Sequence, residues 1–178
     1  MLRRIAQVAG VIVAMLVAFA AYMGLFSSVR ILESEEGPFV FVYREMSGTD
    51  MQQVARITTE LHGLLTKAGV SGNPFDVFQP QDSGKPHEIG FVIAEPDLAR
   101  VQAEDKSLGT RAIPRQLYMK AEFPFRNRFS FIAGYMKVDP ALAAYRAAHG
   151  FVTAPAIARN DGETITYLQP VVRSTAKN

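Results

Sequence analysis

The side chains that most often carry out catalysis or bind metals do not form recognisable sets in this sequence. The chain has no cysteine, which excludes a zinc–thiolate site, an iron–sulfur cluster and a cysteine nucleophile. Its three histidines, His62, His87 and His149, lack the spacing of metal ligands. Ser130 lies in Phe-Ser-Phe-Ile-Ala-Gly, without the Gly-x-Ser-x-Gly elbow of many hydrolases. We therefore predict no metal ion and no cofactor, and we assign no catalytic residue.

The charge balance of the chain gives no sign of a nucleic-acid partner. Its 19 Lys and Arg face 17 Asp and Glu, a net charge of +2. Two of the cations, Arg3 and Arg4, precede an apolar run, so residues 28–178 carry 17 charges of each sign. Domains that bind nucleic acid usually present a basic surface. We therefore predict that no nucleic acid is bound.

The apolar run from Ile5 to Phe26 predicts a membrane-spanning helix. It has 22 residues, no charge and one polar side chain, Gln7. A helix of this length spans roughly 30 Å, the thickness of the hydrocarbon core of a bilayer. The alternative is a cleaved signal peptide, for which Ala18-Phe19-Ala20 resembles the cleavage site. The run is longer than a usual signal-peptide core, which favours an uncleaved signal-anchor that contacts the bilayer through residues 5–26.

The flanking charges predict how the chain is oriented. Arg3, Arg4 and the terminal amine precede the apolar run, and Arg30 follows it, then Glu33, Glu35 and Glu36. Positive residues stay on the cytoplasmic side of a membrane. We expect a single-pass protein with a cytoplasmic N-terminus and a domain on the far, periplasmic or extracytoplasmic, side.

The remainder of the chain shows the patterns of alternating strands and helices. Residues 38–46 are rich in β-branched and aromatic side chains, as strands are. A helix is expected to follow, with Thr49 or Asp50 as its N-cap and Gly69 just beyond its end. Strands are predicted at 74–79, 87–94, 115–123, 154–159 and 163–171, a linker at 95–109, and a second helical stretch at 127–148 that breaks at Asp139-Pro140.

This order is a strand–helix–strand–strand unit that occurs twice. One unit is too small to bury its own apolar faces, so two units side by side should share one sheet. The sequence thus predicts an α+β fold, a duplicated β-α-β-β antiparallel sheet with helices on one face, preceded by one transmembrane helix. The predicted parts are an anchor (1–27), a linker (28–36), a domain (37–172) and a tail (173–178). A groove between the two units is a natural place for a ligand.

The domain resembles the GyrI-like small-molecule binding domains, also described as a duplicated SHS2 fold. The resemblance covers about residues 37–172 and depends on the order and spacing of short motifs. It is similar in particular to a membrane-anchored branch that includes an animal endoplasmic-reticulum autophagy receptor. The motifs are 74–78 (Pro-Phe-Asp-Val-Phe), 87–93 (His-Glu-Ile-Gly-Phe-Val-Ile), 123–125 (Phe-Pro-Phe), 139–145 (Asp-Pro-Ala-Leu-Ala-Ala-Tyr), 154–155 (Ala-Pro) and 167–170 (Tyr-Leu-Gln-Pro).

The resemblance implies a set of ligand-binding residues. Some members hold lipophilic cations in the groove with aromatic walls and a buried carboxylate, which together compensate a cation that has left water. The family often carries that carboxylate in a Glu-x-Tyr pattern, where this chain has Ala158-Arg159-Asn160. Glu88 is then the remaining candidate. The implied wall residues are Phe41, Tyr43, Phe78, Tyr118 and Tyr167.

Three functions follow from this interpretation. The first is a membrane-anchored domain that binds a small hydrophobic molecule, neutral or cationic, without catalysis. The second is a protein-interaction or scaffold domain whose groove is filled by its own side chains or by a partner segment. The third is a hydrolase of reactive hydrophobic compounds that uses Glu88 with Tyr118 or Tyr167, as a small subset of the family does. An open groove above Glu88 would favour the first function and a groove filled by Phe and Tyr the second.

Overall fold

The computed structural model describes residues 2–22, 24, 26, 28–48, 50–127 and 129–173. The helices are α1 (Leu2–Tyr22), α2 (Met51–Lys67), α3 (Leu98–Glu104) and α4 (Phe129–His149). The strands are β1 (Leu32–Glu36), β2 (Phe39–Met46), β3 (Gly72–Phe78), β4 (His87–Ile93), β5 (Gly109–Ile113), β6 (Gln116–Pro124), β7 (Ala156–Asn160) and β8 (Thr164–Pro170). The α+β class and all six predicted strands are confirmed.

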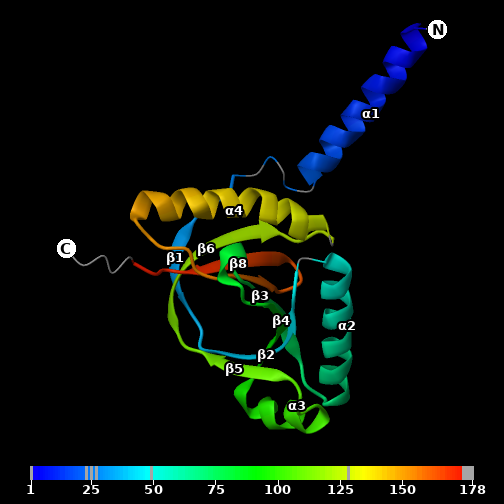
Figure 1. Cartoon of the computed structure of the whole chain (residues 1–178). Helices are drawn as coiled ribbons and strands as arrows, with labels where there is room; N and C mark the ends of the chain where they lie inside the picture. Colours follow the sequence, from blue (N-terminus) through cyan, green and yellow to red (C-terminus); the bar gives the residue numbers. More distant parts are fainter. Residues whose placement is uncertain are drawn as a thin grey trace.

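The eight strands form one antiparallel sheet in the order β1-β6-β8-β7-β3-β4-β2-β5. Both predicted units are present, as β2-α2-β3-β4 and β6-α4-β7-β8, and each is preceded by an additional strand. These additional strands are exchanged, because β1 pairs with β6 of the second unit and β5 pairs with β2 of the first. The two units are therefore tied together at both ends of the sheet (Figure 1).

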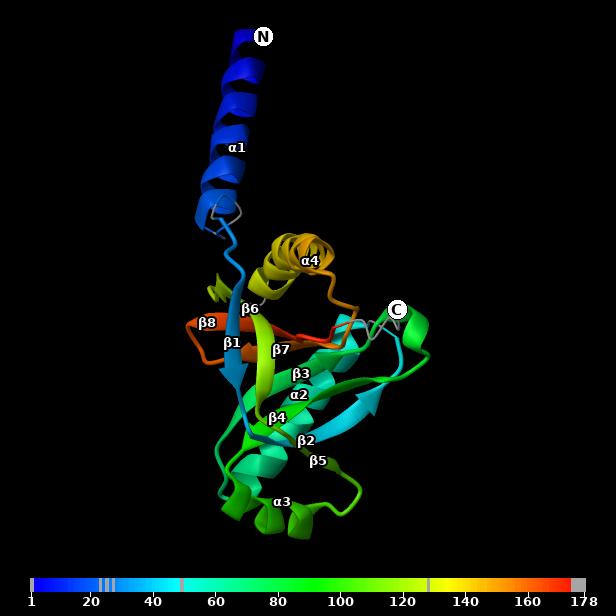
Figure 2. The same cartoon turned by 90° about the vertical axis from the view of Figure 1, so that its left-hand side faces the viewer.

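Two short connections require the sheet to curl. Gly37-Pro38 joins β1 to β2, and Pro114-Arg115 joins β5 to β6, although these strands lie near opposite ends of the strand order. The two connections also touch: a Cβ added at Gly37, whose φ is +98°, would lie 3.2 Å from the carbonyl oxygen of Pro114. Figure 2 shows β2 and β5 curving back under β1 and β6. The sheet thus has a concave inner face and a convex outer face.

The helices α2 and α4 both cover the convex face, as predicted. Alternate side chains of each strand point to opposite faces. Val42 and Ile89 pack in the core beneath α2, and Met119 and Ile165 pack in the core beneath α4. The helix α2 lies along one side of the sheet and α4 lies across its end (Figure 1). The concave face, which carries the opposite set of side chains, has no helix in either view.

Two segments predicted to be linkers contain regular structure. The predicted linker 28–36 includes β1, whose polar sequence does not alternate like a half-buried strand; its backbone pairs with β6, and Glu36 forms ion pairs there. The predicted linker 95–109 contains a short 3₁₀ turn (Glu95–Asp97) and α3, which buries Val101 against α2. Leu98 and Val101 alone are too short a period to predict a helix, but tertiary packing stabilises it.

The predicted break at Asp139-Pro140 is wrong, since α4 runs without interruption from Phe129 to His149. Proline removes one backbone donor inside a helix and usually bends or ends it. Pro140 lies on the exposed side of α4, where the carbonyl that loses its partner can be hydrated.

The predicted N-cap of α2 is confirmed for one of its two candidates. The Asp50 side chain accepts a hydrogen bond from the backbone of Gln52 at 2.9 Å. The alternative cap, Thr49, lies outside the described residues.

The helix α1 projects away from the remainder of the protein in both views (Figure 1; Figure 2). Among the described residues we find no helix with the length and apolar character needed to span a bilayer. The transmembrane helix predicted at 5–26 is therefore not supported by the structure. Residues 23 and 25 of that run, and the side chains of residues 5, 6 and 8, lie outside the described part of the chain, as does 174–178 of the predicted tail.

Candidate functional site on the concave face

The concave face is filled by a layer of apolar side chains. Phe41 and Phe75 lie at its centre, with their ring centroids 5.1 Å apart, and both are fully buried. Tyr118, from β6, and Leu168, from β8, extend the layer into the second unit and are also fully buried. Because β3 and β7 pair with Val77 opposite Ile157, this layer is continuous across the two units. The remaining members are Phe39 and Ile113, with Tyr43 and Val92 partly buried against them.

An ion pair between an enclosed carboxylate and a half-exposed arginine lies at one margin of this layer. The alternation of β4 points Glu88 to the concave face, together with Val92. Arg111, on the edge strand β5, reaches Glu88 with both terminal nitrogens: Nη2 lies 2.7 Å from Oε2, and Nη1 donates to Oε1 at 3.1 Å. The Glu88 side chain is 10% exposed, whereas that of Arg111 is 39% exposed. The carboxylate is thus enclosed while its partner still reaches solvent.

The same guanidinium lies over two aromatic rings. Its central carbon is 5.7 Å from the ring centroid of Phe41 and 5.9 Å from that of Tyr43. The two rings are stacked, with centroids 5.0 Å apart and an interplanar angle of 17°. Cations within about 6 Å of a ring face are attracted by its quadrupole. The Glu88 carboxylate and the two ring faces therefore contact the same cation. That cation is the guanidinium of Arg111, a residue of the same chain.

The surroundings of Glu88 raise the pKa of its carboxyl through burial, against the effect of its arginine partner. Burial raises the pKa of the Glu88 carboxyl, the Arg111 guanidinium opposes that shift, and Glu45, opposite Glu88 on β2, adds to it. Burial and the Glu88 charge also raise the pKa of the Tyr43 hydroxyl, which stays protonated at neutral pH. A ligand cation that replaced Arg111 beside Glu88 would be stabilised here.

Gly90 allows β2 and β4 to approach closely beside this pair. A Cβ built at Gly90 would lie 2.0 Å from the backbone oxygen of Val42 and 2.9 Å from Cε2 of Phe41. Close approach of two backbones is a common reason for glycine inside a strand. Gly90 thus brings the stacked rings of β2 next to the Glu88 carboxylate of β4.

A second group of charges lies on the same face in the other unit. Glu36 of β1 contacts Lys120 at 3.4 Å and Arg159 at 3.5 Å. The Arg159 guanidinium lies 5.9 Å from the ring centroid of Phe39, much as Arg111 lies over Phe41. Lys120 also pairs with Glu122 at 3.0 Å, and that hydrogen bond is the main reason that its pKa is raised. Each margin of the aromatic layer therefore carries an arginine over a ring and a carboxylate that holds it.

Four of the six residues predicted to bind a ligand lie together on the concave face: Glu88, Phe41, Tyr43 and Tyr118. The structure does not bring Phe78 and Tyr167 to them. Phe78 packs between the two cores under the helices. The Tyr167 hydroxyl donates to the carbonyl of Phe131 in α4 at 3.3 Å, and burial raises its pKa. Both side chains therefore lie on the convex side of the sheet.

Sequence reasoning missed Arg111 and Arg159 as members of this site. The segment Gly109–Ile113 was not predicted as a strand, so Arg111 had no assigned face. Arg159 was noted only as a departure from the Glu-x-Tyr pattern of the GyrI-like family. The sequence contains one signal for this strand. Gly109, Arg111 and Ile113 are every second residue of 109–113, so they would share one side of a short edge strand.

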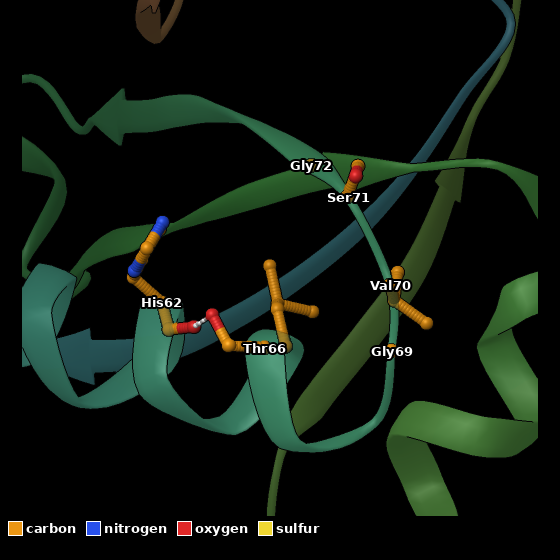
Figure 3. Close-up of a pocket in the computed structure, with 7 residues that line it drawn as sticks. His62, Thr66, Gly69, Val70, Ser71 and Gly72 are labelled. Atoms are coloured by element: carbon orange, nitrogen blue, oxygen red, sulfur yellow. Dashed lines mark hydrogen bonds between the residues drawn. The ribbon is translucent and has the colours of Figure 1, made fainter.

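Two surface depressions formed by described residues lie away from this face. One, of about 340 Å³, lies at the end of α2 and is lined by Leu65, Gly69 and Val70 among others. Figure 3 shows His62 and Thr66 beside it, with the Thr66 hydroxyl donating to the His62 carbonyl at 2.8 Å. A second lies over α3, lined by Gln102 and Lys106. In the described part of the chain, no group of three or more His, Asp or Glu is placed to hold a metal ion.

The fold and this site define a class of protein with a curled α+β sheet and an aromatic, carboxylate-bearing inner face. No protein-family profile matches the chain, and no curated protein is similar to it in sequence. Solved structures do share its fold. The structure titled "Crystal structure of EcmrR C-terminal domain" has a TM-score of 0.56 and 9% identity, and covers 82% of this chain and 99% of that chain. The structure titled "Cryo-EM structure of EcmrR-DNA complex in EcmrR-RPo" has a TM-score of 0.58 and 10% identity, and covers 96% of this chain and 69% of that chain.

These matches support the coarser part of the predicted resemblance. The EcmrR C-terminal domain has a fold that resembles GyrI-like ligand-binding domains. No match to the membrane-anchored branch, or to its autophagy receptor, was found among these structures. At identities of 10% and below, the similarity concerns the fold.

One prediction about partners is overturned by these matches. The neutral charge of residues 28–178 led to the prediction that the protein has no nucleic-acid partner. A structural neighbour over 96% of this chain is titled as a DNA complex, so chains of this fold occur in proteins bound to DNA. Net charge was an inadequate guide, because it describes the whole domain and not the surface or neighbouring segment that a nucleic acid would contact.

Proposed function

We propose that the domain binds a small hydrophobic molecule, neutral or cationic, on its concave face beside Glu88. The observation that carries this proposal is the enclosed Glu88 carboxylate next to stacked rings, balanced by a half-exposed arginine of the same chain. The fold shared with the EcmrR C-terminal domain supports it, since that fold resembles ligand-binding domains. The ligand would contact Tyr43 and Arg111 first, because they form the outermost layer over Phe41.

The expected affinity is low. Burial of about 200 Å² of apolar ligand surface contributes roughly 5 kcal/mol, at about 25 cal/mol per Å². Part of this gain is offset by the reorganisation of Tyr43 and Arg111, whose present contacts must be exchanged for contacts with the ligand. Dissociation constants of about 0.2 mM to several millimolar are therefore expected for single compounds.

Substitution of Glu88 tests this proposal. Glu88→Gln keeps the size of the side chain and removes its charge, so binding of a hydrophobic cation should weaken by about tenfold, or ~1.4 kcal/mol. Neutral analogues should bind within about twofold of the wild type, since ring contacts are unchanged. Ligand-observed NMR with a series of hydrophobic cations and neutral analogues measures both effects.

The matched control is Glu60→Gln, which removes an exposed carboxylate that pairs with Arg44 on the helix-covered side. This variant should bind every compound like the wild type. The proposal is wrong if the folded wild type binds no compound of either kind. Equal weakening in both variants would remove Glu88 from the site.

A second candidate function, a protein-interaction domain, is favoured by the outer surface of α4. Phe129, Ile132, Tyr135 and Met136 are between 48% and 67% exposed, while the opposite side of this helix is buried. Exposed apolar groups that lie side by side often mark protein contacts. The concave face, which is filled by Phe and Tyr side chains, also favours this alternative over an open ligand groove.

The interaction hypothesis predicts self-association or partner binding that depends on α4. Ile132→Glu together with Met136→Glu should abolish any concentration-dependent association of the wild type in light scattering. Met51→Glu, at an exposed apolar residue on α2, is the control and should leave association unchanged. A wild type that stays monomeric at several hundred micromolar would argue against self-association through this face.

The predicted location is a separate proposal. We infer from the flanking charges that the domain lies on the far side of a membrane from the N-terminus. Protease added to intact bacterial spheroplasts that express the chain should then cleave the domain. Cleavage only after the cells are lysed would contradict this orientation.

A further inference from the structure

We propose that Arg111 is a built-in competitor for the ligand: its guanidinium occupies the cation position beside Glu88, and a ligand cation binds by displacing it. This inference rests on the proposed function, because it concerns the same site. It assigns a role to a residue that the ligand hypothesis does not require. It also predicts that the wild type binds a cation more weakly than the same site would without the Arg111 guanidinium.

The contacts of Arg111 are those that a bound organic cation would make. A cation removed from water is stabilised by a carboxylate and by the faces of aromatic rings. Arg111 has both, with two nitrogen–oxygen contacts of 2.7 and 3.1 Å to Glu88 and its central carbon within 6 Å of Phe41 and Tyr43. Arg111 therefore already balances the Glu88 charge, and a second cation cannot pair with Glu88 while Arg111 stays.

The position of Arg111 allows it to leave. It lies in β5, a strand of five residues at the end of the sheet that pairs only with β2 in the described structure. Its side chain is 39% exposed, so rotation outwards can return the guanidinium to water. Glu88 lies in the interior strand β4 and is 10% exposed, so it cannot follow. Displacement of Arg111 would leave an enclosed carboxylate that requires another cation.

The energetic consequence follows from competition within one molecule. A ligand that binds only the open state has an affinity reduced by the fraction of molecules in that state. If the pair is formed in about 90% to 99% of molecules, the apparent affinity is lowered by about 10- to 100-fold. Removal of the guanidinium should therefore strengthen binding of a cation, which is opposite to the usual effect of deleting a binding-site residue.

The test measures binding of tetraphenylphosphonium and of triphenylphosphine oxide, its uncharged relative, by equilibrium dialysis of the full chain in non-ionic detergent. Arg111→Gln should bind the phosphonium at least about tenfold more tightly than the wild type, and the oxide within about twofold. Arg111→Gln combined with Glu88→Gln should lose this gain. Arg115→Gln, which removes an arginine from an exposed pair with Glu35, should leave both affinities unchanged.

The outcomes separate this inference from the proposed function. Unchanged or weaker phosphonium binding by folded Arg111→Gln would overturn the inference, while wild-type binding would still support the proposed function. Absence of binding by both the wild type and this variant would overturn both. If Arg111→Gln does not fold, Arg111→Lys provides the test: it keeps the charge but cannot form the two parallel contacts, so phosphonium binding should tighten by about two- to fivefold. Unchanged binding by the lysine variant would again overturn the inference.

Discussion

Gly90→Ala is expected to destabilise the domain by about 3 kcal/mol or more and to disrupt the Glu88 site. The added methyl group would lie 2.0 Å from the backbone oxygen of Val42 and 2.8 Å from Cα of Tyr43. These are backbone atoms of the neighbouring strand, so no side-chain rotation can relieve the overlap. Strands β2 and β4 would have to separate, which would move the stacked rings of Phe41 and Tyr43 away from Glu88.

Urea unfolding and ligand binding measure the two parts of this prediction. The matched control is Gly63→Ala in α2, where an added Cβ has no neighbour within 4 Å. Alanine is favoured over glycine inside a helix by about 1 kcal/mol, so this control should be slightly more stable than the wild type. A Gly90→Ala variant as stable as the wild type would show that β2 and β4 are not so closely apposed.

The helices and the interior strands could be predicted because their sequences carry local periods. The segment 51–67 has an apolar residue every three or four positions, and Asp50 supplies its cap. The edge strands β1 and β5 have no such period. Residues 32–36 are mostly acidic or polar, and they form a strand because the exchange between the two units gives their backbones a partner. The partners lie 80 to 88 positions apart for β1 and 66 to 74 for β5, separations that a local pattern does not contain.

The same limit explains why the site residues were placed only in part. Adjacent side chains are buried on both faces of three strands: Phe41 and Val42 in β2, Tyr118 and Met119 in β6, and Tyr167 and Leu168 in β8. A strand covered on both faces has no polar side, so its sequence does not indicate which side chain points inwards. Tyr167 therefore points to α4, and Leu168 points to the concave layer. Arg111 meets Glu88 because β5, β2 and β4 are neighbours in the sheet. This strand order is known only from the sheet topology.

Asp76 makes the stability of the domain depend on pH near neutrality. It lies on β3 directly behind the site, and its Oδ1 accepts a hydrogen bond from the backbone of Gly90 at 3.3 Å. Burial raises the pKa of its carboxyl to about 7, and the Gly90 hydrogen bond opposes that shift only in part. Between pH 4 and 7 the folded chain therefore holds a proton that the unfolded chain has lost. Stability falls as pH rises through this range and levels off above pH 7.

We expect Asp76→Asn to remove this pH dependence. A shift of about three pKa units corresponds to ~4 kcal/mol, and because solvent still reaches part of Asp76 we expect about half of that. The amide keeps the oxygen that accepts from Gly90 and cannot ionise, so the variant should gain about 2 kcal/mol over the wild type at pH 8 and little at pH 4.5.

Urea unfolding of both proteins at several pH values measures this difference directly. Asp139→Asn, at an exposed aspartate on α4, should follow the wild-type curve at every pH. Parallel curves for Asp76→Asn and the wild type would contradict the raised pKa.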